Sequence, residues 1–396
     1  MRGKVLMQDP QTALGNSLIP AAARIHVQGI HLPKNRLEAR KLIREKIPRV
    51  PGIYGYIDRS KRLIYVGKSK ALRHRLLSYT SKNPPDAKMT RIVRQAHALV
   101  WEPISHELLA LLREQELISR WRPVCNTQGQ PQRRQPVFLK LDMNAAPFAT
   151  HARRVSHDTT HHFFGPIAGS KEVGHAIVSM NYAFRLRDCH SKTPMNYGNQ
   201  LELFPELRSP MCIRAELGTC TAPCAGGCTQ NEYESQAQAA LAFLEGKDLS
   251  ILIQLQENMF EGSQKQAFER AAIYRNQFDH LSWLSRRLEM LRKARKDLHG
   301  VFPIPGFNHQ TVWAIFQRGT IQRMVATTET QDSHDQLLHQ IQVALMDDQQ
   351  PVPKSTHEIY MQLILMAWFR KHREDRHRII SFDAVSYTHL TLPTKA

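Results

Sequence analysis

Residues 51–126 constrain the fold of this chain more than any other stretch. Two short apolar runs, residues 53–57 and 63–66, are separated by a polar segment, which is the pattern of a β-hairpin. Gly67 follows the second run, and residues 71–80 then have helical spacing with leucines on one side and cations on the other. The sequence therefore predicts two paired strands followed by a helix that carries positive charge beside them.

The polar residues of this stretch suit phosphodiester hydrolysis. Tyr54 and Tyr65 lie on the paired strands, Lys68 follows the second strand, and Arg75 lies further along the helix. A phenol has a pKa of about 10, and a nearby ammonium favours its ionised form, so a tyrosine beside Lys68 is a candidate general base. Arg75 would stabilise charge on the phosphoryl oxygens, and Glu114 would hold a divalent cation. For any one of them, the alternative is simple packing within an ordinary hairpin.

Taken together, these residues resemble the GIY-YIG nuclease superfamily. Gly52-Ile53-Tyr54 matches the first half of its signature and Tyr65-Val66-Gly67 the second. The match is to the branch of UvrC, the incision subunit of bacterial nucleotide excision repair, and its shorter relative Cho. The resemblance implies an α+β fold in which a small antiparallel sheet is flanked by helices. It places the family's functional residues at Tyr54, Tyr65, Lys68, Arg75, Tyr79, Glu114 and Asn126.

The resemblance also implies a role for each of these positions. Tyr54 or Tyr65 would be the general base for in-line attack by water, and Lys68 would tune the phenol. One Mg²⁺ or Mn²⁺ would bind Glu114. Arg75 matches the catalytic arginine of the family, and Tyr79 matches a further active-site tyrosine. Asn126 matches the asparagine that closes the domain. Two departures, Val66 for isoleucine and Cys125 for tyrosine, leave this chemistry untouched. The sequence does not choose between the two candidate bases.

The charge of the chain favours a nucleic-acid partner without deciding the matter. The 396 residues include 54 basic and 35 acidic side chains, a formal charge of +19, and the pI is near 9.9. Each phosphate that such a protein neutralises steepens the salt dependence of binding by roughly 0.9 log unit per log unit of salt. Many basic proteins, however, are merely kept soluble by their charge. No signal-peptide or membrane-spanning pattern is present, so we expect a cytoplasmic protein that does not bind membranes.

Composition and stop signals predict six parts. They are an N-terminal arm and basic helix (residues 1–47), the nuclease domain (48–128), a Cys-rich linker domain (129–245), a helical hairpin (246–292), a small α/β segment (293–384) and a disordered or non-native tail (385–396). The tail resembles a translated cloning adapter. If the chain is cut there, the absence of the RNase H-like and helix-hairpin-helix domains of full UvrC says little about the natural protein, and the sequence leaves its continuation beyond residue 384 open. The first 30 residues are expected to be a loose arm. The basic helix is expected at 37–47 with a solvated or DNA-contacting face.

Other helices and strands are expected within these parts. Helices are predicted at 105–121, 170–184 and 232–245, and strands at 136–141, 311–317 and 320–328. The first of these helices would carry Glu114 to the nuclease site.

Five of the six cysteines lie between residues 189 and 228. Without a secretion signal, clustered cysteines are more often metal ligands than disulfides, and thiolates select zinc or an iron–sulfur cluster. Spacing alone leaves zinc, a cluster and a set of reduced structural cysteines open. UvrC proteins share the run from Gly218 to Cys224 in nearly this form, and the resemblance implies a [4Fe–4S] cluster. Its ligands would be Cys189, Cys212, Cys220 and Cys224, with Cys228 extra to the pattern.

Two amphipathic helices are predicted at residues 250–262 and 266–284. Such a hairpin cannot bury both apolar faces alone, so it packs either against this chain or against a partner. Met259 with Phe268 and Arg275 resembles the UVR motif, through which UvrC binds UvrB. Gly262-Ser263 and Asn276 depart from that motif, where alanines and aspartate are usual. The resemblance implies UvrB as a partner.

The sequence as a whole favours an endonuclease of nucleotide excision repair. It would hydrolyse a phosphodiester on the 3′ side of a lesion in double-stranded DNA after loading by UvrB. One alternative is a catalytically silent adaptor on the same fold, which would bind DNA or UvrB without cleavage. Another is a homing or restriction nuclease that cuts specific sequences unaided, against which the cysteines and the hairpin argue.

Overall fold

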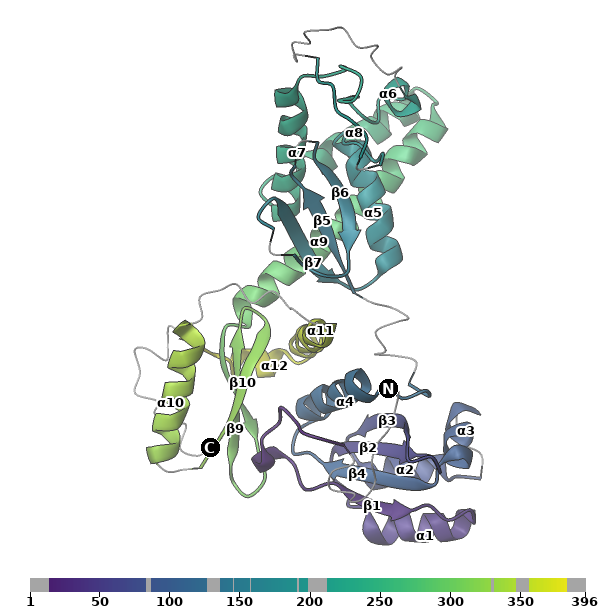
Figure 1. Ribbon diagram of the computed structural model, residues 1–396, viewed down its shortest axis with the longest axis vertical. Helices are drawn as coiled ribbons and strands as arrows, with labels where there is room; N and C mark the ends of the chain where they lie inside the picture. The colour runs from purple at the N-terminus through teal and green to yellow at the C-terminus, as the bar shows by residue number, and fades with distance from the viewer. Residues whose placement is uncertain are drawn as a thin grey trace. The chain divides into compact units, whose positions relative to one another are not determined.

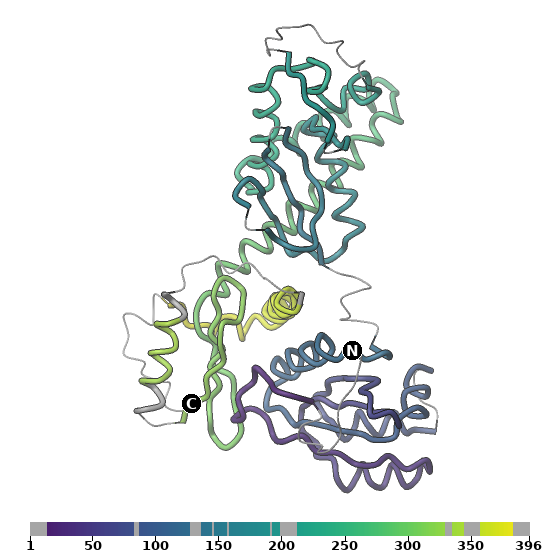
Figure 2. The backbone as a smooth tube through the Cα atoms, in the orientation of Figure 1, coloured from purple at the N-terminus to yellow at the C-terminus, as the bar shows by residue number. Residues whose placement is uncertain are grey.

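The computed structural model describes residues 14–82, 87–126, 136–144, 146–156, 158–190, 192–198, 212–328, 331–346 and 356–382. They form two compact units (Figures 1 and 2). The first unit comprises the described residues before 135 together with those after 293, and the second comprises those between. The predicted tail, 385–396, lies outside the described residues. The six-part division stays a prediction, but 48–128 and all of 293–384 except residue 293 fall within one unit.

An antiparallel sheet forms the centre of the part of the first unit that precedes residue 135, in which the sequence predicts a nuclease domain and which we call the nuclease half. Its strand order is β1-β4-β2-β3, and β2 pairs with β3 so that Tyr54 lies opposite Gly67. The predicted hairpin is therefore confirmed. The strands are β1 (Gln28–His31), β2 (Gly52–Ile57), β3 (Leu63–Ser69) and β4 (Ala98–Pro103).

Alternation along the strands gives this sheet two buried faces. Ile53 and Val66 belong to one hydrophobic cluster, whereas Tyr54 and Ile64 belong to another on the opposite face. The first face is covered by one helix, α4 (Glu107–Trp121), which agrees with the helix predicted at 105–121. The second face is covered by α1 (Arg36–Lys46), α2 (Leu72–Tyr79) and α3 (Ala87–Gln95).

The N-terminal segment differs from the loose arm that the sequence predicts. From residue 14 onward it packs on the nuclease sheet, with Leu14 and Ile19 fully buried, and it contributes the edge strand β1. A short 3-10 helix, η2 (Ala21–Ala23), lies beside the C-terminal strands, where the Phe307 amide donates to the Ala22 carbonyl (Figure 2). Arg113 and Arg120 of α4 also bind carbonyl oxygens of this segment. These long-range contacts leave no local pattern in the sequence.

The C-terminal segment forms a second antiparallel sheet in the same unit. Its order is β10-β9-β8-β11, and the predicted strands at 311–317 and 320–328 are confirmed. Its elements are β8 (Gly300–Pro305), β9 (Thr311–Gln317), β10 (Thr320–Thr327), α10 (Gln331–Met346), α11 (Thr356–Lys371), α12 (Arg373–His377) and β11 (Ile380–Ser381).

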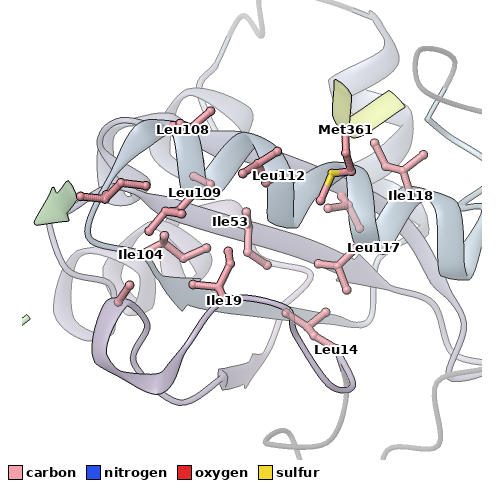
Figure 3. Packing of buried hydrophobic residues seen from close by; sticks show 14 of the residues in the cluster. Leu14, Ile19, Ile53, Ile104, Leu108, Leu109, Leu112, Leu117, Ile118 and Met361 are labelled. Atoms are coloured by element: carbon pink, nitrogen blue, oxygen red, sulfur yellow. The ribbon is translucent and has the colours of Figure 1, made fainter. Parts of the chain in front are cut away.

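The nuclease half and the C-terminal segment share one hydrophobic core. Figure 3 shows Met361 of α11 beside Leu117 and Ile118 of α4, and all three belong to a cluster that also contains Leu365 and Phe369. The side of α4 that faces away from the nuclease sheet is thus covered by α11. The helix that carries Glu114 is therefore buried on two sides.

The second unit packs helices on a three-stranded sheet of order β6-β5-β7. Tyr233 is fully buried in it, donating to the Pro147 carbonyl and accepting from the Arg187 amide. Its elements are β5 (Val137–Asp142), β6 (Phe148–Ala152), β7 (His161–Ile167), α5 (Ser170–Ala183), α6 (Ile213–Glu216), α7 (Gln230–Glu245), α8 (Ser250–Gln264) and the residues up to Lys293 of α9 (Phe268–Asp297). The strand predicted at 136–141 and the helices predicted at 170–184 and 232–245 are confirmed. In the described parts of the chain, no helix combines the length and apolar character needed to span a bilayer.

Candidate active site

Three tyrosine hydroxyl groups meet at one end of the β2–β3 hairpin. The Tyr54 and Tyr79 oxygens are 2.7 Å apart, and the Tyr79 hydroxyl donates to that of Tyr65 at 3.5 Å. The β-hairpin supplies two of these side chains and α2 the third. Gly67 makes room for them, because a Cβ atom at this position would lie 2.6 Å from the Tyr54 hydroxyl. Any larger residue would displace the phenol, so the glycine of the signature has a direct steric reason.

Arg75 is a cation that interacts directly with these phenols. Its guanidinium lies 5.4 Å from the centre of the Tyr79 ring, and its hydrogen bond to Tyr54 lowers the pKa of that phenol. Burial outweighs this effect and raises the pKa of Tyr54 well above 10. The pKa of Tyr65 is raised as well, first by burial and then by the charge of Tyr79. Both phenols are therefore neutral at pH 7.

Lys68 differs from the sequence expectation. Its ammonium binds Oε1 of Glu107 at 2.5 Å rather than a phenol, so the predicted tuning of a tyrosine by Lys68 is not what this geometry provides. The same carboxylate binds the Lys70 ammonium at 2.8 Å. Sequence reasoning missed Glu107. The available signal was its spacing, because Glu107 lies seven residues before Glu114 and so on the same side of the helix.

Glu114 lies near the predicted partners. Its Oε1 accepts a hydrogen bond from the Lys68 amide at 3.2 Å. Its charge interacts electrostatically with Tyr65 and Arg75. Burial raises the pKa of Glu114 to about 7, while the Lys68 amide and the charges of Lys68 and Arg75 oppose the shift. A half-buried carboxylate with one oxygen already hydrogen-bonded suits Mg²⁺ or Mn²⁺, since Mg²⁺ usually binds through one or two carboxylates and keeps several waters.

Asn126 acts on the backbone of the hairpin. Its buried side chain accepts from the Val66 amide at 2.9 Å and donates to the Val66 carbonyl at 2.8 Å, as a neighbouring strand would. Val66 lies between Tyr65 and Gly67, so Asn126 fixes the strand that carries the half-buried Tyr65. The structure thus gives Asn126 a positioning role rather than contact with the reacting groups. Tyr56, which sequence reasoning also missed, packs against the rings of Tyr54 and Tyr79.

Four cysteines of the second unit lie close enough to affect one another. Cys189 and Cys212 raise the pKa of both Cys220 and Cys224, although burial is the largest cause in each case, and the pKa of Cys220 reaches about 11. Cys228 is different, since its thiol donates to the Thr221 hydroxyl at 3.4 Å. Within the residues that the structure describes, no three potential ligands are arranged to hold a metal ion. The four predicted cluster ligands are neighbours without forming a metal site.

Comparison with known proteins gives two family matches. Residues 50–127 match the UvrC-like GIY-YIG domain, and residues 137–243 match the middle domain of UvrC/Cho excinucleases. The UvrABC system protein C of Bartonella quintana is 30% identical over 252 residues, which are 63% of this chain and 35% of that protein. The homologue of Dictyoglomus thermophilum is 32% identical over 256 residues, 64% of this chain and 41% of that protein. The chain therefore spans less than half the length of these relatives.

A solved structure is also similar to part of this chain. It is the GIY-YIG N-terminal endonuclease domain of UvrC from Thermotoga maritima, described as bound to its catalytic divalent cation, magnesium. The domain is 38% identical to this chain, and the match covers 22% of this chain and 96% of that domain, with a TM-score of 0.20.

Proposed function

We propose that this chain, which carries a UvrC-like GIY-YIG domain and the middle domain of UvrC/Cho excinucleases, is a metal-dependent endonuclease of nucleotide excision repair. The observation that carries the proposal is the meeting of phenol, guanidinium and carboxylate groups at one end of the hairpin. The Tyr54 and Tyr79 hydroxyls are 2.7 Å apart, and Arg75 interacts with both tyrosines. Glu114 interacts electrostatically with Tyr65 and Arg75. An adaptor that only bound DNA would not need this set.

Tyr65 is the better placed of the two candidate bases. Tyr54 is completely buried and hydrogen-bonded to Tyr79, whereas Tyr65 is partly exposed, so a water molecule can reach only the latter. Because the Tyr65 phenol is neutral at pH 7, its hydroxyl proton would first pass to solvent. As the phenolate, Tyr65 would then take the proton of a water that attacks the phosphodiester in line. Arg75, which is half-buried beside the phenols, would stabilise the charge that develops on the phosphoryl oxygens.

Glu114 is the residue that would hold the divalent cation. A cation bound there supplies charge neutralisation for the leaving oxygen. Lys68 orients the Glu114 carboxylate through its backbone amide, and Asn126 holds the strand between Tyr65 and Gly67. Each of these residues thus acts on the position of a group rather than on the substrate itself.

The reaction is tested on an end-labelled duplex with one defined lesion, incubated with and without UvrB and Mg²⁺. We expect a cut on the 3′ side of the lesion that requires both, and no cut by Glu114→Gln, which should still bind DNA. Asp58→Asn, which removes an ion-paired carboxylate in the β2–β3 turn, serves as the matched control. Metal-independent DNA binding without any cut would favour the adaptor.

The partner UvrB is proposed to bind the hairpin of α8 and α9. The two helices approach closely at Gly262, whose added Cβ would lie 3.3 Å from that of Ala271. Phe260 and Phe268 are 62% and 66% exposed, so an apolar surface remains available to a partner. We expect Phe268→Ala to reduce capture of UvrB, whereas Leu37→Ala, an equally exposed residue of α1, should leave capture unchanged. Equal capture by both variants would contradict this partner site.

A [4Fe–4S] cluster on Cys189, Cys212, Cys220 and Cys224 is proposed from the family resemblance and from the mutual influence of these thiols. Their side chains are not arranged as a metal site here, so they would have to move together to hold it. No catalytic step depends on it, because hydrolysis needs no redox centre. Anaerobic purification followed by metal analysis should find iron. Zinc at one ion per chain without iron would contradict the cluster and favour the zinc alternative.

A further inference from the structure

Lys68 connects the end of β3 to α4 at two points. Its ammonium binds Oε1 of Glu107 at 2.5 Å, and its backbone amide donates to Oε1 of Glu114 at 3.2 Å. Lys70 occupies the second oxygen of Glu107 at 2.8 Å. The Lys68 and Glu107 side chains are only 29% and 19% exposed, so water screens this pair less than a surface ion pair.

Both glutamates lie on one side of α4. They are separated by seven residues, which is about two turns or 10.5 Å along a helix, and Lys68 lies between them. The flexible four-carbon side chain of a lysine can turn towards either carboxylate. In this structure Glu107 holds the ammonium, and Glu114 receives only the amide hydrogen bond. The charge of Lys68 already acts on Glu114, so without Glu107 the Glu114 carboxylate becomes a candidate partner for the ammonium.

We propose that Glu107 is a positioning residue that holds the Lys68 ammonium away from Glu114 and so keeps the Glu114 carboxylate open to a divalent cation. The inference rests on the proposed function in one respect, namely that Glu114 is the cation ligand. It adds a competition that the nuclease motif does not contain, in which an internal ammonium and the metal contend for one carboxylate. Glu107 decides that competition in favour of the metal.

The test is calorimetric titration of the full chain with Mn²⁺. We expect Glu107→Gln to weaken Mn²⁺ binding roughly 10- to 100-fold, the range for residues that orient a metal ligand. Adding Lys68→Met to Glu107→Gln should restore most of the affinity, because the competing ammonium is then gone. Glu114→Gln should abolish the binding, and Asp58→Asn, the matched control at the distant turn, should leave it unchanged.

Two outcomes would overturn the inference. The inference is wrong if Glu107→Gln binds Mn²⁺ as tightly as the wild type. It is also wrong if Glu107→Gln binds weakly and the addition of Lys68→Met does not restore the affinity, because Glu107 would then have only a structural role. If Glu107→Gln does not fold, Glu107→Asp replaces it, since the shorter acid should release Lys68 in part and show the same restoration. A wild-type chain that binds Mn²⁺ but never cuts DNA would refute the proposed nuclease while leaving this inference standing.

Discussion

The surroundings of Glu114 determine whether its carboxyl group is charged near neutral pH. Burial raises its pKa to about 7, above the ordinary value of 4.5, so the folded protein holds this proton where the unfolded chain has lost it. The stabilisation is therefore complete below pH 4.5 and is lost as the pH rises through 7. Glu114→Gln should remove this dependence.

Thermal unfolding of the wild type and Glu114→Gln in a chelator, from pH 4.5 to 8, measures the effect. Relative to the variant, the wild type should lose about 3 kcal/mol over this range. Added Mg²⁺ should restore the wild type near pH 8 and leave the variant unaffected. Parallel stability curves for the two proteins would contradict the raised pKa of Glu114.

The difference in exposure between the two signature tyrosines gives a second prediction. Tyr65→Phe should lower the rate of incision by roughly 10²–10⁴, the range for loss of a general base. Tyr54→Phe should lower it only about tenfold, the effect of one lost hydrogen bond. Single-turnover incision measures both rates, and fluorescence anisotropy should show unchanged DNA affinity. The reverse order of the two rates would make Tyr54 the base.

The sequence predicts which residues lie at the candidate site better than it predicts what each of them contacts there. Tyr54, Tyr65 and Gly67 are fixed by the strand register, which follows from local alternation. The partner of Lys68 could not be predicted in this way, because Glu107 lies 39 residues further along the chain on a different element. A charged side chain chooses its partner by tertiary distance, which a linear pattern does not contain.

Among the helices and strands, α4 has the most constrained position. Arg113, fully buried next to Glu114, binds Glu102 at 3.0 Å, Glu116 at 2.8 Å and the Gly15 carbonyl at 2.9 Å. Glu102 of β4 is also fully buried and pairs with Arg24. One charged network thus joins α4 to β4 and to the N-terminal segment. The loose arm predicted from the sequence was wrong from residue 14 onward, since its anchors are backbone carbonyls that carry no sequence signal.

Removing Arg113 should destabilise the first unit strongly. Arg113→Met leaves Glu102 and Glu116 short of a buried partner, and breaking a buried pair typically costs about 3–5 kcal/mol. Urea unfolding should show this loss, whereas Arg62→Met, which removes an exposed partner of Asp58, should cost about 1 kcal/mol or less. Equal effects of the two variants would mean that the buried network contributes little.

For the molecule as a whole, the shared core makes the C-terminal segment part of the nuclease unit. Leu365 of α11 is fully buried in the cluster that contains Ile53 of the nuclease sheet. Leu365→Ala should therefore cost about 2–5 kcal/mol, as cavity-forming core substitutions do. Val343→Ala on α10, where the side chain is 44% exposed, is the matched control.

Limited proteolysis gives the readout for this prediction. In Leu365→Ala, the nuclease residues should become sensitive at a lower temperature than in the control, because both halves lose one core. Sensitivity confined to residues after 293 would instead indicate two independent domains. The sequence predicted the small sheet and helices of the nuclease half, and the structure confirms them. It could not predict the shared core, because an amphipathic pattern shows which face of a helix is buried but not which element covers that face.

The discontinuity of the first unit has a consequence for biosynthesis. Its core joins Ile53 to Phe369, and the residues of the second unit are translated between these two. At about 5–20 residues per second, a ribosome would need tens of seconds or less to add that interval. Throughout it, the nascent nuclease half exposes the apolar side of α4. We expect the second unit to fold first, although the first unit begins nearer the N-terminus. We also expect chaperones to bind the nascent nuclease half until the C-terminal segment has been translated.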